Sequence, residues 1–196
     1  MITGMIRPQS GKIFLDSTDI TEMPMYKRAK NKIGYLAQEP SVFTKLSVEE
    51  NINLVLEMTD LTKEERKNRL EELLDEFSIE HIRKSKAYVL SGGERRRTEI
   101  ARSLVINPNF ILLDEPFAGI DPLAVEDIQK IIEKLKLKGI GVLITDHNVR
   151  ETLTITDRSY LLYNGEILKS GSTKELVNDK DVKRLYLGSN FKMETK

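Results

Sequence analysis

Two apolar runs flank an amphipathic stretch between residues 110 and 145, and this pattern constrains the fold more than any other feature of the sequence. The runs cover residues 110–113 and 141–145, and between them apolar side chains recur at helical spacing after Asp121, which can cap a helix. Strands that are apolar on both faces are typical of parallel sheets covered by helices. The segment therefore predicts a βαβ unit, which places the chain in the α/β class.

Shorter elements are predicted around this unit. Strands are expected at residues 12–15, 32–37, 160–163 and 166–169. The dipeptide Asn164-Gly165 predicts a hairpin between the last two strands, and S-x-x-E capping boxes predict helices after Ser47 and Thr62. Two short helices are expected to close the chain. We interpret residues 1–196 as one domain with a mixed, mainly parallel sheet, into which a helical subdomain of about residues 47–105 is inserted.

The composition excludes several classes of function. The chain has 196 residues, with 31 lysines and arginines against 31 aspartates and glutamates, and no cysteine. The lack of cysteine excludes a disulfide scaffold, a thiol nucleophile and a zinc–thiolate site, and the balanced charge argues against nucleic-acid binding. No apolar run approaches the ~18 residues of a membrane span, and the first residues lack the pattern of a signal peptide. The composition thus predicts a cytosolic protein.

A glycine turn precedes a predicted helix at Ser91-Gly92-Gly93-Glu94. Ser91 and Glu94 fit the capping-box pattern, and the following helix directs its free N–H groups and the positive end of its dipole at the turn. Such a turn suits a phosphate group. An ordinary capped helix after a glycine turn explains the same residues equally well.

Acidic and polar residues follow the predicted strands at the points where these end. Asp114 and Glu115 come directly after the first apolar run, and His147 follows the second. Because open α/β sheets bind ligands at the carboxyl ends of their strands, Asp114 is a candidate ligand of Mg²⁺ and Glu115 could orient a water molecule. His147 could donate a hydrogen bond to a phosphate oxygen. Each of these residues alone could equally be a solvated side chain, and so could Gln38, which follows the strand at residues 32–37.

In their order along the chain, these motifs resemble those of the ATP-binding subunits of ABC transporters. The string LSGGE resembles the family signature, LLDEP resembles Walker B, and AGID around Asp121 resembles the D-loop. Gln38 matches the Q-loop glutamine and His147 the switch histidine. The resemblance implies a P-loop NTPase-like core, ATP and Mg²⁺ as cofactors, and ATP hydrolysis as the activity.

The resemblance also implies a second copy of the chain as partner and a role for each site residue. Two copies would sandwich two ATP molecules head to tail. Glu115 would act on the attacking water and His147 on the γ-phosphate, and Asp114 and Gln38 would hold the metal. The implied nucleotide-binding residues are Gln38, Ser91, Gly92, Gly93 and Asp121.

Membrane permease subunits are the other partners that the resemblance implies. A groove between the Gln38 loop and the helical subdomain would receive them, and its candidate lining residues are Phe43, Val42 and Leu46. Ordinary packing under the subdomain is the alternative for these side chains. The implied location is cytoplasmic, on the inner face of the inner membrane.

Within the family, the strings LSGGERRRTEIARSL and YLGSNF resemble the lipopolysaccharide-export ATPases of Gram-negative bacteria. Lipopolysaccharide extraction and export is therefore the expected function. Branched-chain amino-acid importers are the alternative, and they usually carry glutamines where this chain has Arg95, Arg96 and Arg97. Those arginines could also form a solvated helix face.

The phosphate-binding loop G-x-x-x-x-G-K-[ST] has no match in the sequence. By resemblance, we expect the chain to begin inside or just after the helix that follows this loop, with the loop and the first strands upstream. Little ATP hydrolysis is then expected of these residues alone, because the loop supplies a lysine and backbone donors to the phosphates. A binding module without catalysis is accordingly the alternative function.

Overall fold

The fold is taken from a computed structural model, which describes residues 1–188, 191 and 193. Ser189 and Asn190 of the string YLGSNF lie outside the described residues. The chain divides into two compact units, Met1–Asp146 and His147–Lys196, which are described separately.

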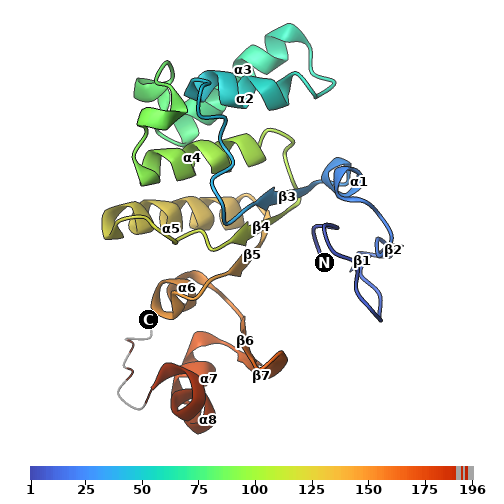
Figure 1. Cartoon of the computed structure of the whole chain (residues 1–196), viewed down its shortest axis with the longest axis vertical. Coiled ribbons are helices and arrows are strands. Elements are labelled where there is room, and N and C mark those ends of the chain that lie inside the picture. Colours follow the sequence, from blue (N-terminus) through green and yellow to red (C-terminus); the bar gives the residue numbers. More distant parts are fainter. Residues whose placement is uncertain (189–190, 192, 194–196) are drawn as a thin grey trace. The chain divides into compact units, whose positions relative to one another are not determined.

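A three-stranded parallel sheet forms the centre of the first unit (Figure 1). Its strands lie in the order β3 (Ile33–Leu36), β4 (Phe110–Asp114), β5 (Gly141–Thr145). Helix α5 (Pro122–Leu137) connects β4 to β5, so the predicted βαβ unit is confirmed. The α5 side chains Ile128, Ile132 and Leu135 are buried, as their helical spacing predicts.

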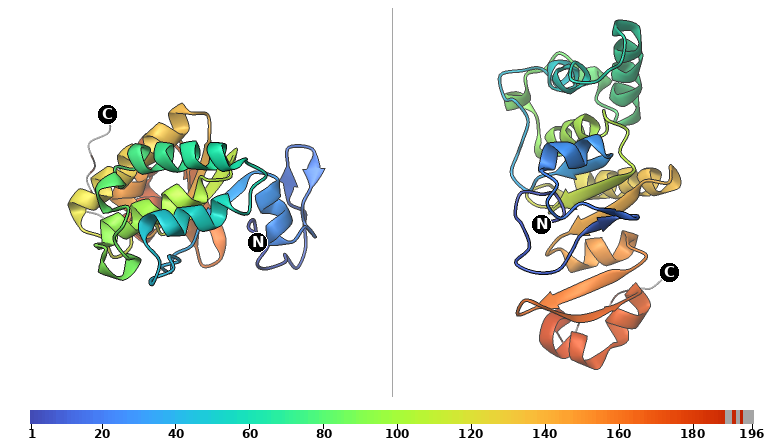
Figure 2. Two further views of the ribbon diagram at one scale, coloured as in Figure 1. Left: turned by 90° about the horizontal axis from the view of Figure 1, so that it is seen from above. Right: turned by 90° about the vertical axis from the view of Figure 1, so that its right-hand side faces the viewer.

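A layered group of helices covers this sheet. The views in Figures 1 and 2 place α4 (Gly92–Ser103) over the strands, with α2 (Val48–Leu56) and α3 (Lys63–Glu76) beyond it. Short 3-10 turns, η1 (Glu80–Ile82) and η2 (Ala87–Val89), lead from α3 to α4. The three predicted capping boxes of this unit, at Ser47, Thr62 and Ser91, are all present.

The N-terminal segment is held by one buried arginine. Arg28 of helix α1 (Met25–Lys30) is only 2% exposed, and its guanidinium donates to five backbone carbonyl oxygens, those of Met1, Ile2, Ile20, Thr21 and Met23. These bonds fasten the first residues and the small hairpin of β1 (Phe14–Leu15) and β2 (Thr18–Asp19) to α1. Strand β1 is shorter than the strand predicted at residues 12–15, and the sequence did not predict β2.

The second unit contains the predicted hairpin and helices around a small apolar core. Its elements are α6 (Val149–Ile155), β6 (Ser159–Tyr163), β7 (Glu166–Gly171), α7 (Thr173–Asn178), α8 (Lys180–Val182) and the π-helical turn η3 (Lys183–Leu187). Asn164 and Gly165 have φ angles of 50° and 82°, as a two-residue turn between twisted strands requires. Leu153, Leu161 and Leu176 form its core. Among the described residues of the whole chain, no helix is both long and apolar enough to span a membrane.

Candidate functional site

Asp114 lies at the carboxyl end of the central strand, and each of its carboxylate oxygens accepts a hydrogen bond from a hydroxyl group. Thr145, its register partner on β5, donates from Oγ1 to Oδ1 at 2.5 Å, and Tyr35 on β3 donates from its hydroxyl to Oδ2 at 3.3 Å. Burial and the nearby Asp114 charge raise the pKa of Tyr35, so its hydroxyl stays a donor. The carboxylate is therefore held from both flanking strands.

The oxygen chemistry of this residue fits Mg²⁺. A carboxylate oxygen that accepts one hydrogen bond keeps lone-pair capacity for a hard cation. Among the described residues, no group of three or more histidine, cysteine, aspartate or glutamate side chains could hold a metal. Mg²⁺ typically takes one or two carboxylates and completes its shell with water and substrate phosphates, so Asp114 suits such an ion.

Glu115 has a backbone conformation that few residues other than glycine adopt. Its φ is +45°, which costs about 1–2 kcal/mol for a residue with a Cβ. Its N–H donates to the Thr145 carbonyl oxygen at 2.7 Å, and its own carbonyl oxygen accepts from Arg96 Nη2 at 2.9 Å. Such strain persists where surrounding contacts enforce it, and it occurs often at functional sites.

Arg96 of helix α4 joins the sheet edge to the segment before Gln38. Arg96 is 6% exposed, and its guanidinium donates to the carbonyl oxygens of Ala37 at 2.9 Å and Asp114 at 3.0 Å, in addition to that of Glu115. The interpretation of Arg96 as part of a solvated face is wrong, because Arg96 lies on the buried face of α4. Arg95 and Arg97, by contrast, are partly exposed.

A second buried charge anchors the other side of the Gln38 loop. Glu99 is 3% exposed, pairs with Arg96 at 3.3 Å, and accepts from the Ser41 N–H at 2.6 Å. The loop is thus fixed to α4 at both Ala37 and Ser41, while Gln38 itself is exposed. Because β3 and β4 are parallel neighbours, Gln38 leaves the sheet at the same edge as Asp114.

The signature turn, Ser91-Gly92-Gly93-Glu94, packs against the segment around Asp121. A Cβ on Gly93 would lie 2.8 Å from the Ala124 Cβ, and one on Gly92 would lie 3.4 Å from the Gly119 carbonyl oxygen. Asp121 Oδ1 accepts from the Ala124 N–H at 3.0 Å and caps α5 as predicted. The glycines therefore serve close packing of α4 on α5, and Ser91 at the start of α4 is exposed.

His147 begins the second unit, directly after Asp146 of the first. The strand that precedes the two acids and the strand that precedes the histidine are neighbours in the sheet, since Asp114 pairs with Thr145. Asp146 Oδ2 accepts from the Phe117 N–H at 3.2 Å and ties the end of β5 to the turn after Glu115. A place for His147 beside Glu115 stays a prediction.

The three candidate groove residues differ in burial. Val42 is 7% exposed and belongs to the core, as the packing alternative expects, and Leu46 is partly buried. Phe43 is 51% exposed, with the Arg102 guanidinium carbon 5.8 Å from its ring centre. Of the three, Phe43 therefore presents the largest apolar surface to a partner.

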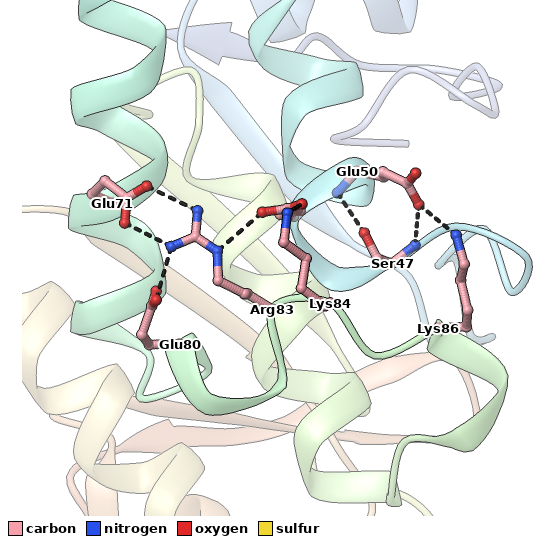
Figure 3. Close-up of polar contacts among 8 residues, drawn as sticks. Ser47, Glu50, Glu71, Glu80, Arg83, Lys84 and Lys86 are labelled. Atoms are coloured by element: carbon pink, nitrogen blue, oxygen red, sulfur yellow. Dashed lines mark hydrogen bonds and ion pairs between the residues drawn. The ribbon is translucent and has the colours of Figure 1, made fainter.

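Sequence reasoning missed a polar network that braces the helices before the signature turn (Figure 3). Arg83 contacts carboxylates from three elements: Glu49 at 3.0 Å, Glu71 at 2.9 Å and Glu80 at 2.8 Å. Lys86 pairs with Glu50 at 3.0 Å, and the bonds from Ser47 and Lys86 lower the pKa of Glu50 to about 2.

Comparisons with known proteins give one consistent result. Residues 1–118 match the ABC transporter family. A probable ABC transporter ATP-binding protein of Azorhizobium caulinodans is 55% identical over 98% of this chain and 69% of its own length. The lipopolysaccharide export system ATP-binding protein LptB of Haemophilus influenzae is 53% identical over 98% of this chain and 80% of its own length. The solved ATP-binding cassette MJ0796, a dimer in a post-hydrolysis state with bound ADP and phosphate, superposes with a TM-score of 0.76 at 27% identity, covering 87% of this chain and 77% of that one.

Proposed function

Because the chain belongs to the ABC transporter family of ATP-binding proteins, we propose that it is the ATP-hydrolysing subunit of a lipopolysaccharide exporter. The carboxylates at the end of β4 carry the enzymatic part of this proposal, because they lie where α/β sheets bind ligands and Asp114 is fixed by two hydroxyls. The relative named LptB supports the choice of lipopolysaccharide over amino acids as substrate.

In the proposed site, Asp114 and Gln38 hold Mg²⁺, whose charge offsets that of the phosphates. Glu115 orients the attacking water, and its strained backbone conformation at the end of β4 is of a kind that occurs often at functional sites. His147 donates to the γ-phosphate. Because charge in phosphoryl transfer spreads over the transferred oxygens, these residues act mainly by position and electrostatics.

A second copy completes each site in this proposal. Ser91, Gly92 and Gly93 of one copy face the γ-phosphate held by the other, and Asp121 links the two sites. The exposure of Ser91 at the start of a twelve-residue helix supports this arrangement, and so does the dimeric state of the solved MJ0796 cassette.

Permease subunits at the membrane are the proposed mechanical partners. The exposed Phe43 ring follows the Gln38 loop, which is anchored to α4 at Ser41, so a partner that contacts Phe43 can report on the site. This contact would hold the protein on the cytoplasmic face of the inner membrane. We also propose that residues 47–105 form the inserted helical subdomain, which would line the other side of the groove beside the Gln38 loop.

The proposed ATPase activity is tested by measuring Mg-ATP hydrolysis. The protein for this assay is expressed from its native gene, including any codons upstream of Met1. Glu115→Gln is expected to keep ATP binding and to lower kcat by roughly 10²-fold or more, because it removes the group that positions water. Glu133→Gln, an exposed carboxylate on α5, is the matched control. Unimpaired hydrolysis by Glu115→Gln contradicts the assignment, and a native protein without any hydrolysis favours the binding module.

Depletion of the protein in its host tests the substrate. Lipopolysaccharide is expected to accumulate at the inner membrane because its extraction stops. Normal surface lipopolysaccharide combined with lost uptake of branched-chain amino acids would favour the importer instead.

A further inference from the structure

Two residues outside the family motifs, Tyr35 and Thr145, contact the proposed metal ligand. We propose that both are positioning residues that set the Asp114 carboxylate for a divalent cation, an inference that rests on the proposed function. The Tyr35 hydroxyl lies 3.3 Å from Oδ2 and Thr145 Oγ1 lies 2.5 Å from Oδ1. Each oxygen of the carboxylate thus has its own hydroxyl donor.

The two donors come from opposite sides of the carboxylate. Tyr35 lies on β3 and Thr145 on β5, the strands that flank β4 in the sheet. Rotation of an aspartate carboxylate about its last torsion is soft, so a single donor leaves its plane poorly defined. Donors at both oxygens from two neighbouring strands define that plane, and the sheet fixes the strands.

The donors leave the carboxylate able to bind a cation. A hydroxyl hydrogen bond occupies one lone pair, and each oxygen keeps another with which it can bind a cation. Partners that orient a ligating carboxylate are worth about 10–100-fold in metal affinity. The proposal therefore predicts a loss of cation affinity when either hydroxyl is removed.

A purely structural role makes a different prediction. If the two hydroxyls only stabilise the sheet edge, their removal lowers the free energy of unfolding and leaves cation affinity unchanged in the folded protein. Metal affinity, measured apart from catalysis, therefore separates the two roles.

The test is a Mn²⁺ titration, followed by electron paramagnetic resonance, of the natively encoded protein saturated with the non-hydrolysable analogue adenylyl imidodiphosphate. Tyr35→Phe and Thr145→Val are each expected to raise the Mn²⁺ dissociation constant about 10-fold. Thr145→Ser, which restores a hydroxyl, is expected to recover most of the affinity. Tyr26→Phe and Thr44→Val, at exposed positions of the same unit, are matched controls.

The outcomes separate this inference from the function on which it rests. Native affinity in both folded variants, while Asp114→Asn loses Mn²⁺, overturns the positioning role and leaves the proposed function standing. A native protein that binds no Mn²⁺ with the nucleotide contradicts the proposed function itself. Loss of affinity in Thr145→Val together with recovery in Thr145→Ser supports the inference.

Discussion

Arg96 and Arg83 each hold several segments together, but they do so in opposite environments. Arg96 is 6% exposed and donates mainly to backbone carbonyl oxygens, which keep their charge state at every pH. Arg83 has a side chain that is 25% exposed and pairs with the carboxylates of Glu49, Glu71 and Glu80. Interactions of the second kind weaken in salt and acid.

The different environments of Arg96 and Arg83 indicate which contacts hold the proposed site in place. The backbone at the edge that carries Asp114 and Glu115 is held by the buried Arg96, which donates to main-chain carbonyl oxygens, so these bonds should respond little to salt and acid. The helices that lead to Ser91 are held together by charge pairs at the surface, so their position should respond to salt concentration and pH. Four substitutions that change stability by different amounts test this contrast.

Arg96→Met should cause the largest loss of stability. It leaves Glu99 as a buried charge without its cation and four carbonyl oxygens without the Arg96 donor, so we expect the free energy of unfolding to fall by about 3–5 kcal/mol. Urea denaturation measures it, with Arg95→Met on the same helix as the control. A loss below about 1 kcal/mol would show that the buried network is dispensable.

Gly93→Ala should come next, because a new methyl group would lie 2.8 Å from the Ala124 Cβ. Overpacking of this kind costs about 1–3 kcal/mol, and denaturation of the folded protein measures it. Gly92→Ala is the comparison, since its Cβ would meet its nearest atom at 3.4 Å. Equal effects at both positions would contradict the packing account of Gly93.

Arg83→Met should destabilise by only about 1 kcal/mol at low salt, because exposed charge pairs are screened by solvent. The loss should shrink further in 1 M NaCl, where the Debye length is about 3 Å. Thermal unfolding at both salt concentrations checks this. An effect as large as that of Arg96→Met, or one that salt leaves unchanged, would erase the contrast between the two arginines.

The smallest effect should be a pH dependence at Glu50. The pKa of Glu50 is lowered to about 2 in the folded chain, against about 4.3 for an unperturbed glutamate. A lowered pKa stabilises the fold fully above the unfolded value, and this contribution disappears as the pH falls through the folded value. Between about pH 4.3 and 2, Glu50→Gln should therefore lose less stability than the native chain, as acid denaturation curves can show. Parallel curves for the two proteins would disprove this contribution.

Strong periodicity explains which parts of the fold could be predicted. Strands β4 and β5 and helix α5 lie within a residue of their expected positions, because their apolar patterns and their capping residue agree. Helix α1 was missed, since it is short and its buried residue is Arg28, whose bonds to distant carbonyls leave no local pattern. Strand β2 has only two residues, which is too short to show an alternating apolar pattern.

The site could be predicted only in part. The motifs indicated Asp114, Glu115 and Ser91 as candidate site residues, and the capping boxes predicted the helix starts. The burial of Arg96 was missed, although its spacing of three from Gly93 and Glu99 places it on the buried face of α4. The hydroxyl donors to Asp114 depend on strand order, which a sequence pattern does not give.

We propose that one triphosphate is held between the Asp114–Glu115 edge of one copy and the Ser91 turn of another. The most direct test of this arrangement is sedimentation velocity of the Glu115→Gln variant expressed from the native gene. We predict a stable dimer with ATP, a monomer without it, and a monomer with ATP once Ser91→Arg is added. ATP-bound Glu115→Gln protein that stays monomeric, or a dimer that Ser91→Arg leaves intact, would contradict the account.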